Sequence, residues 1–98
     1  MEDNQNKNIF EAIKHIEGDI EYWIARELQE ILEYKEWRFF EKVIKNAIIN
    51  CKNSGIEEKE HFGVYSKLSK RNNNAEVKIK DYKLSRYACY LIVQNGAW

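Results

Sequence analysis

A run of seven residues near the end of the sequence, 87–93 (YACYLIV), carries no charge and no strongly polar side chain. A helix of this composition is apolar on every side, so the rest of the chain is expected to cover it. Ser85 is placed to cap the N-terminus of this helix. Asn95-Gly96 is a typical stop, since glycine takes the left-handed conformation without a Cβ penalty. The sequence therefore predicts a core helix over residues 85–96.

The residues just before this helix follow a different period. Val77 and Ile79, and after Asp81 also Tyr82 and Leu84, nearly alternate with lysines. A period of two is typical of a half-buried strand, here one with lysines on its solvent face. A basic strand is therefore expected to lead into the core helix.

The clearest amphipathic helix is predicted over residues 37–52. Its apolar side chains recur with helical spacing and form one stripe: Phe40, Val43, Ile44, Ala47, Ile48 and Cys51. Asn53-Ser54-Gly55 is a typical helix end. We expect the stripe to pack on residues 87–93.

The other segments are shorter. We predict a helix as far as about Ile16, a turn at 17–19, a strand at 20–25, a helix at 26–34 and an acidic connector at 56–61. Residues 62–68 fit either a strand or a helical turn, residues 69–74 a mobile polar loop, and residues 1–7 a frayed end. This order predicts a single α+β domain over residues 1–98, mainly helical, with a minor antiparallel sheet.

The composition limits the class of protein. With 44% apolar and 33% charged residues, no apolar run near 20 residues and no signal peptide, the chain is expected to be a cytoplasmic globular protein without a membrane segment. Cys51 and Cys89 lie in apolar patterns, which favours reduced thiols over a disulfide. With His15 and His61 they form no metal-binding spacing. No glycine-rich loop or nucleophile elbow is present, so we expect no metal, no cofactor and no catalytic residue, and hence no enzyme.

The charge is unevenly distributed although the net charge is zero. Residues 1–60 carry fourteen acidic and nine basic residues, and residues 61–98 carry two acidic and seven basic ones. Cations displace counterions from phosphates and aromatic rings stack on unpaired bases, so the basic segment is a candidate contact surface. Its proposed contacts with nucleic acid or a partner are Lys67, Lys70, Arg71, Lys78, Lys80, Lys83, Arg86 and Tyr82, with Tyr65, Tyr87 and Tyr90 interleaved.

Alternatives exist for each of these surfaces. Strand lysines also solvate and protect a sheet edge. The acidic helix faces could mimic a phosphate backbone or dock on a basic partner, but a solvated face is the commoner explanation. Trp98 follows the predicted helix stop and is a candidate anchor for a partner, or folds back as a lid.

Several segments together resemble a known family. They are residues 10–16 (FEAIKHI), 21–34 (EYWIARELQEILEY), 37–44 (WRFFEKVI), 51–55 (CKNSG), 61–62 (HF) and above all 80–96 (KDYKLSRYACYLIVQNG). The chain is similar in these to the N-terminal part of the DinD, or DNA-damage-inducible protein D, family, and more distantly to phage Bro-N antirepressor domains. The resemblance implies a non-enzymatic protein of the SOS response that modulates RecA filaments on single-stranded DNA. It supplies no functional residues to carry over.

The family's proteins continue beyond the Asn-Gly that matches Asn95-Gly96, whereas this sequence ends at Trp98. The activity of their C-terminal part is therefore not implied. A short phage-type module suggests a mobile-element protein with a changed target, and small host-defence inhibitors such as anti-CRISPR proteins offer an analogy.

The leading hypothesis is a binding protein that modulates or inhibits a nucleic-acid-handling complex, such as a RecA filament or a CRISPR–Cas nuclease. Its partner would be a protein of that complex. Direct binding of DNA or RNA through the segment 67–86 is the alternative. A hidden enzyme would need a buried carboxylate or histidine in a pocket, and a homodimer is a further possibility.

Overall fold

The helix α3 (Trp37–Asn53) forms the base of the core in the computed structural model, which describes residues 9–70 and 73–96. Phe40, Ile44, Ala47 and Cys51 of its stripe are buried, and the other two stripe residues are partly buried against the same cluster. Gly55, with φ +78°, then turns the chain away. Both the helix and its inward face are confirmed.

The helix α4 (Arg86–Asn95) packs on α3, as predicted. The Ser85 hydroxyl accepts a hydrogen bond from the Ala88 N–H at 3.0 Å, which confirms the predicted cap. The expectation that this helix is covered on every side is wrong. Tyr90 and Val93 are exposed, because α3 and the strands contact α4 over only part of its circumference.

The end of α4 lies where the sequence places it, but for a different reason. Gly96 has φ −90° and ψ 157°, which is extended and not left-handed. A Cβ at Gly96 would overlap the hydroxyl of Tyr34. The glycine is therefore suited to this position by its lack of a side chain.

The N-terminal residues form a hairpin that the sequence predicts only in part. The strands β1 (His15–Glu17) and β2 (Ile20–Ile24) pair antiparallel around Gly18, which has φ +63°. Ile16 therefore lies in a strand, and the predicted helix ends before it, at residue 12 of the described chain. Extended pairing with β2 overrides the helical spacing at this point. The chain continues directly into α2 (Ala25–Ile31).

The strands β3 (Phe62–Lys70) and β4 (Glu76–Leu84) form the longest hairpin, with nine paired residues from Phe62↔Leu84 to Lys70↔Glu76. The ambiguous segment 62–68 is thus a strand. The predicted loop 69–74 is shorter than expected, because residues 69 and 70 pair in β3, and Asn74 turns with φ +65°. Residues 71–72, like residues 1–8 and 97–98, lie outside the described part. A short 3₁₀ turn, η1 (Glu58–Glu60), precedes β3.

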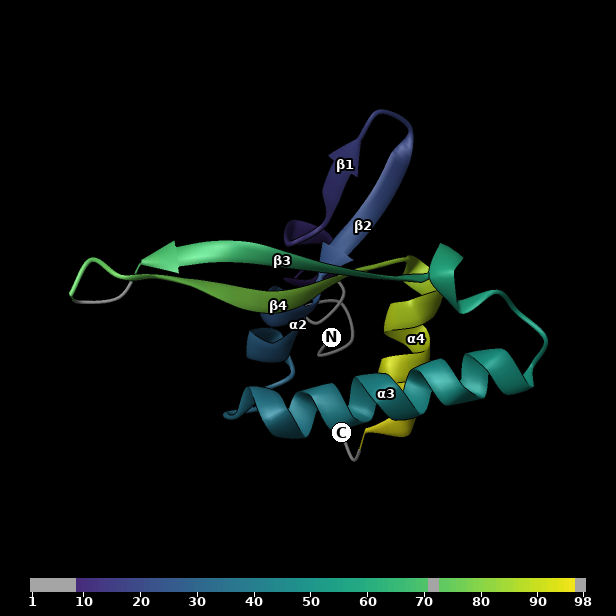
Figure 1. Cartoon of the computed structure of the whole chain (residues 1–98). Helices are drawn as coiled ribbons and strands as arrows, with labels where there is room; N and C mark the ends of the chain where they lie inside the picture. Colours follow the sequence, from purple (N-terminus) through teal and green to yellow (C-terminus); the bar gives the residue numbers. More distant parts are fainter. Residues whose placement is uncertain (1–8, 71–72, 97–98) are drawn as a thin grey trace.

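The four strands follow the order β1-β2-β4-β3, but β2 meets β4 only at Trp23↔Leu84 and Ile24↔Lys83. The two hairpins therefore diverge from this junction, and each projects from the helices in its own direction (Figure 1). The core lies where the junction meets α3 and α4, around Trp23, Phe62 and Leu84. The α+β class is confirmed. None of the described helices has the length and apolar character needed to cross a membrane.

Candidate nucleic-acid interface

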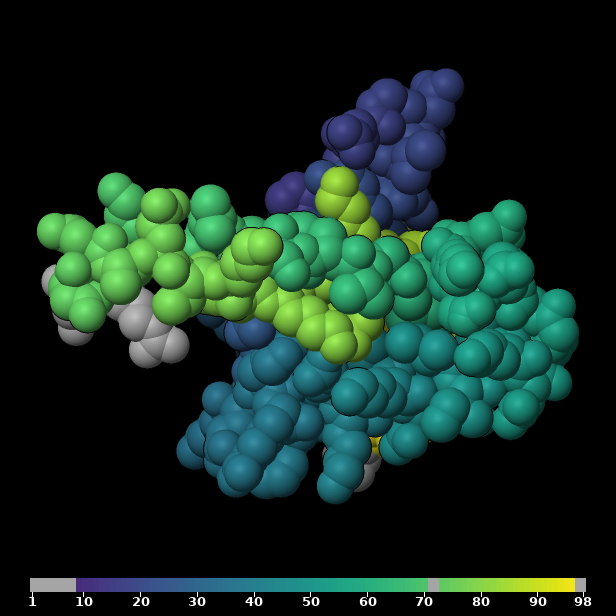
Figure 2. Space-filling model, viewed as in Figure 1, coloured from purple at the N-terminus to yellow at the C-terminus, as the bar shows by residue number. Residues whose placement is uncertain are grey.

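The outer part of the β3–β4 hairpin, residues 66–80, is the most basic feature of the molecule, and we name it the arm. It carries five basic residues and one acidic residue, a net charge of +4, so the remainder of the chain carries −4. At its base Lys80 contacts Glu41 of α3 and Arg26 of α2, and the outer end of the arm projects away from the helices (Figures 1 and 2). The uneven charge seen in the sequence is therefore concentrated on a projecting two-stranded ribbon.

The lysines of the arm do not share one face. Strand side chains alternate between faces, and the register places Lys70, Lys78 and Lys80 on the same face as Tyr82 and Leu84. The prediction of a strand with all lysines on its solvent face is thus wrong. Val77 and Ile79 are odd-numbered and Tyr82 and Leu84 are even-numbered, so a regular strand cannot hold both pairs on one side.

The opposite face of the hairpin carries a smaller set of cations. Lys67 and Lys83 share it with Val77, Ile79 and the carboxylate of Asp81. The basic segment therefore presents two surfaces, and the face with Lys70 and Lys78 extends to the end of the arm.

Four of the predicted contact residues form ion pairs with carboxylates of the same chain: three lysines and, as described below, Arg86. Lys67 Nζ lies 3.0 Å from Asp81 Oδ2, Lys80 Nζ lies 2.8 Å from Glu41 Oε2 and Lys83 Nζ lies 3.9 Å from Glu17 Oε1. These ion pairs reduce the charge that the cations offer to a ligand.

Arg86 is the most strongly paired of the predicted cations. Its guanidinium donates two hydrogen bonds to Glu21, at 2.8 and 3.0 Å, and one to Glu11 at 3.2 Å. Glu21 and then Glu11 raise the pKa of Arg86 above its ordinary value, so the charge is permanent. Arg86 thus ties α4 to the β1–β2 hairpin, and two carboxylates offset its charge.

Tyr82 is not a stacking surface. The residue is 2% exposed and lies in the core, where its ring approaches Trp37. Its hydroxyl donates to Glu41 Oε2 at 3.0 Å, and burial raises the pKa of Tyr82. The proposed contact at Tyr82 is therefore corrected: the residue supports the fold. Tyr87 is half-buried beside His61, and Tyr90 is exposed on α4, away from the arm.

Among the described residues, Lys70 and Lys78 are the two predicted cations that form no ion pair, although Lys70 faces Glu76 across the hairpin. Both are exposed, and neither lies within 4.0 Å of a carboxylate among residues 9–70 and 73–96. The predicted contacts Arg71 and Trp98 lie outside the described residues. The site that remains is the outer part of the arm.

Asp81 is the functional-looking residue that the sequence reasoning missed, since no carboxylate was expected to be buried. It is 0% exposed, and its Oδ1 accepts hydrogen bonds from the backbone N–H groups of Tyr82, at 2.8 Å, and Arg26, at 3.2 Å. Its Oδ2 accepts no directed hydrogen bond within the described chain and faces the Lys67 ammonium. The signal was its position two residues beyond Ile79, which continues the alternation of Val77 and Ile79.

The sequence also did not predict that Tyr22 and Tyr65 would lie near the same lysine. They meet at the junction of the two hairpins, where Lys83 Nζ lies 5.0 Å from the ring centre of Tyr22 and 5.7 Å from that of Tyr65. These distances are those of cation–π contacts. The three side chains hold the hairpins together on the face opposite the core.

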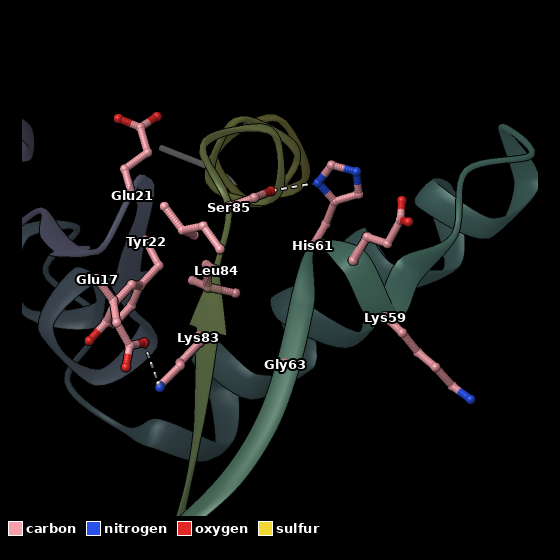
Figure 3. Close-up of a pocket in the computed structure, with 11 residues that line it drawn as sticks. Glu17, Glu21, Tyr22, Lys59, His61, Gly63, Lys83, Leu84 and Ser85 are labelled. Atoms are coloured by element: carbon pink, nitrogen blue, oxygen red, sulfur yellow. Dashed lines mark hydrogen bonds and ion pairs between the residues drawn. The ribbon is translucent and has the colours of Figure 1, made fainter.

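A cavity of about 240 Å³ lies beside this junction (Figure 3). It is lined by Glu17, Ile20, Glu21, Tyr22, Lys59, Glu60, His61, Gly63, Lys83, Leu84 and Ser85. His61 Nδ1 is 2.7 Å from Ser85 Oγ, but that hydroxyl already caps α4. The side chain of Lys59 points away from the cavity in Figure 3. Carboxylates and ammonium groups are mixed in the lining, so the cavity favours no ligand charge.

Comparison with known proteins identifies the family. The chain is 44% identical, over 94 residues, to the DNA damage-inducible protein D of Escherichia coli strain K12. This alignment covers 95% of the chain but 34% of the relative, so the chain spans about a third of that protein's length. No solved structure matches. Residues 12–97 match the N-terminal domain of the BRO family. The chain therefore belongs to the BRO N-terminal domain family, as its resemblance to DinD and Bro-N domains predicts.

Proposed function

We propose that this domain binds nucleic acid through the arm, without catalysing a reaction. The observation that carries the proposal is the pair of exposed lysines, Lys70 and Lys78, on a projecting ribbon of net charge +4. Each cation that replaces a counterion at a phosphate contributes binding free energy that depends on salt.

The shape of the arm supports the same proposal. The B-DNA major groove, about 12 Å wide, admits a two-stranded β-ribbon, and ribbon proteins use strands in this way. The arm is such a ribbon, and its face with Lys70 and Lys78 also carries Leu68, which is exposed. Lysines would contact the backbone and position the ribbon, and an apolar side chain could contact base edges.

The experiment compares two double variants of equal charge change. Lys70→Glu with Lys78→Glu alters the arm, and Lys35→Glu with Lys42→Glu alters exposed lysines of the helical part that also lie outside the ion pairs. Binding of a short fluorescent duplex and of its single strand is measured by anisotropy between about 50 and 200 mM salt. We expect the arm variant to weaken binding at least about tenfold and to lower the slope of log K against log salt by about 2.

The control variant should keep the slope of the unaltered protein, because its lysines lie away from the ribbon. Equal losses in the two variants would show that only net charge matters. A protein without salt-dependent affinity for either probe would refute the proposal. Reversing Lys80 or Lys83 is a poorer test, since it would break an ion pair with Glu41 or Glu17, whereas Lys70 faces Glu76 without an ion pair within 4.0 Å.

A protein partner is the second candidate, and the β1–β2 hairpin favours it. Ile16 and Ile20 are 66% and 68% exposed, and the hairpin also carries Glu17, Asp19 and Glu21. Ile16 and Ile20 lie on opposite faces of the hairpin, paired with Glu21 and Glu17, and exposed apolar side chains beside carboxylates suit a basic protein surface. Together with the arm, this hairpin fits a domain that acts on a nucleic-acid-handling complex.

The test of this candidate is recovery of partners from host lysate, with and without nuclease. A protein that is retained after nuclease treatment, and lost when Ile16 and Ile20 are both changed to Ser, supports it. The E. coli relative is described as DNA damage-inducible, and we extend a role in that response to this chain as part of the same proposal. Inhibition of RecA filaments or of a host-defence nuclease stays a prediction.

A further inference from the structure

The strand β3 has an open edge. It is last in the order β1-β2-β4-β3, so its backbone pairs with β4 on one side only. An edge strand of nine residues presents backbone N–H and C=O groups that can pair with another strand. Two of its side chains, Val64 and Leu68, lie on one face and are 60% and 63% exposed.

The sequence of β3 is complementary to itself about Ser66. If two copies pair antiparallel around a two-fold axis at Ser66, Val64 of each copy faces Leu68 of the other, and Tyr65 faces Lys67. All nine residues then have a partner, and Lys70 faces Phe62. No lysine faces a lysine, whereas moving the axis to Lys67 would place the two Lys67 ammonium groups opposite each other. Apolar and aromatic–cation neighbours of this kind stabilise paired strands.

We propose that the edge of β3 is a homodimer interface, in which the β3 strands of two copies pair antiparallel with Ser66 on the two-fold axis. The occupant is a second copy because this one register matches the exposed apolar residues and separates the lysines. The dimer does not depend on the proposed nucleic-acid binding.

The dimer would also enlarge the surface proposed to bind nucleic acid. Pairing keeps equivalent faces of the two sheets on the same side, so Lys70 and Lys78 of both copies lie on one continuous ribbon. A two-fold arrangement of cations matches a two-fold-symmetric duplex, and the second contact is made at a high effective concentration. Each β3 carries two lysines and no acidic residue, so the strands repel and added salt should favour the dimer.

The first test uses the position on the axis. Ser66→Cys places a thiol opposite its own copy, at a strand separation within the range that a disulfide spans. Ser69→Cys is the matched control, because Ser69 faces Gly63 of the other copy. Cys51 and Cys89 are buried and leave a low background. Under mild oxidation the Ser66→Cys protein should form a covalent dimer, at least about tenfold more than Ser69→Cys.

The second test exploits the pairing of Val64 with Leu68. Val64→Glu alone and Leu68→Lys alone should each weaken the dimer about tenfold, since the axis repeats each altered pair twice. The two changes together place opposite charges across the axis and should restore the dimer to within about threefold of the original. Sedimentation of a concentration series without nucleic acid measures all four proteins.

A monomer at every concentration, with equal cross-linking of the two cysteine variants, overturns the proposal. A dimer that both single changes leave intact also overturns it, because the contact would then lie elsewhere. Salt-dependent DNA binding by such a monomer would leave the proposed function standing. A β3 dimer without affinity for either nucleic-acid probe would refute that function alone.

Discussion

Asp81 connects two segments that lie 55 residues apart. The helix α2 begins after Ile24, whose side chain cannot cap its N–H groups, and Asp81 Oδ1 accepts the Arg26 N–H in its place. A carboxylate at this position also interacts favourably with the partial positive charge at the N-terminus of the helix. The buried aspartate thus attaches the base of the arm to α2.

Replacing Asp81 should lower the free energy of unfolding. Asp81→Ala removes two hydrogen bonds to a side-chain oxygen and leaves the N–H groups of Tyr82 and Arg26 without that acceptor, so we expect a loss of about 2–4 kcal/mol. Asp81→Asn keeps the oxygen and should lose less. Urea denaturation measures both, with the exposed Glu76→Ala as control, expected within about 0.5 kcal/mol. An equal effect of Asp81→Ala and Glu76→Ala would show that the cap contributes nothing.

Glu41 predicts how stability depends on pH. Hydrogen bonding to the Lys80 ammonium, and then to the Tyr82 hydroxyl, holds the pKa of Glu41 below its ordinary value. A depressed folded-state pKa gives stability that is present above the unfolded pKa and is lost as pH falls through the folded one.

Glu41→Gln should therefore lower the unfolding free energy at neutral pH and flatten its decrease below about pH 4. The decrease is not abolished, because the pKa values of Glu11 and Glu21 are also lowered, through Lys14 and Arg86. Urea midpoints between about pH 3 and 7 measure the effect, with Glu30→Gln on the exposed face of α2 as the control. Parallel pH curves for Glu41→Gln and the unaltered protein would contradict the assignment.

At the scale of elements, the start of α4 depends on one side chain. Ser85 Oγ accepts the Ala88 N–H and contacts His61 Nδ1, so it joins the helix to the turn before β3. Since α4 supplies Ala88, Cys89, Leu91 and Ile92 to the core, fraying of its first turn would disturb the packing on α3.

Ser85→Ala should lower the free energy of unfolding by about 1 kcal/mol. Ser85→Asp should keep most of the stability that the cap provides, because an aspartate can also accept the N–H hydrogen bond. Chemical denaturation measures the difference. The control is Ser54→Ala, since Ser54 Oγ bonds the Asn50 carbonyl at the exposed end of α3. We expect a smaller loss there. A larger loss at Ser54 would mean that the cap of α4 is not the controlling contact.

At the scale of the molecule, the outer arm and the core are separate. Residues 69–77 supply no buried side chain among those described, and Leu68 faces Lys78 across the hairpin. The arm can therefore be shortened at that pair without changing the register of the remaining strands.

Replacing residues 69–77 by Asn-Gly, the preferred two-residue hairpin turn, should leave the unfolding free energy within about 1 kcal/mol of the original. The shortened protein should lose nucleic-acid affinity, because Lys70 is removed and Lys78 becomes part of the turn. Denaturation and anisotropy on the same sample measure the two effects. Loss of the fold would show that the arm stabilises the core, contrary to its exposure.

The parts of the fold that follow from neighbours in the chain could be read from the sequence. The stripe of α3, the Ser85 cap and the turn at Gly18 depend on spacing and on local backbone conformation. The basic segment could be located too, since composition alone places it in residues 61–98. At Ile16, by contrast, pairing with β2 decided between helix and strand.

What the basic segment presents was decided by the tertiary structure. Lys80 meets Glu41 and Arg86 meets Glu21, partners 39 and 65 residues away, and no local pattern predicts such pairs. Tyr82 entered the core because the strand continues its alternation from Leu84, where β4 joins the sheet. Asp81 lies on the opposite face and is buried where the start of α2 and the Lys67 side chain meet β4. The sequence by itself determined that this protein has a cationic hairpin. Only the packing of distant segments decided that, among the described cations of that hairpin, Lys70 and Lys78 are the ones left without an ion pair, because ion pairs and burial depend on contacts between residues far apart in the chain.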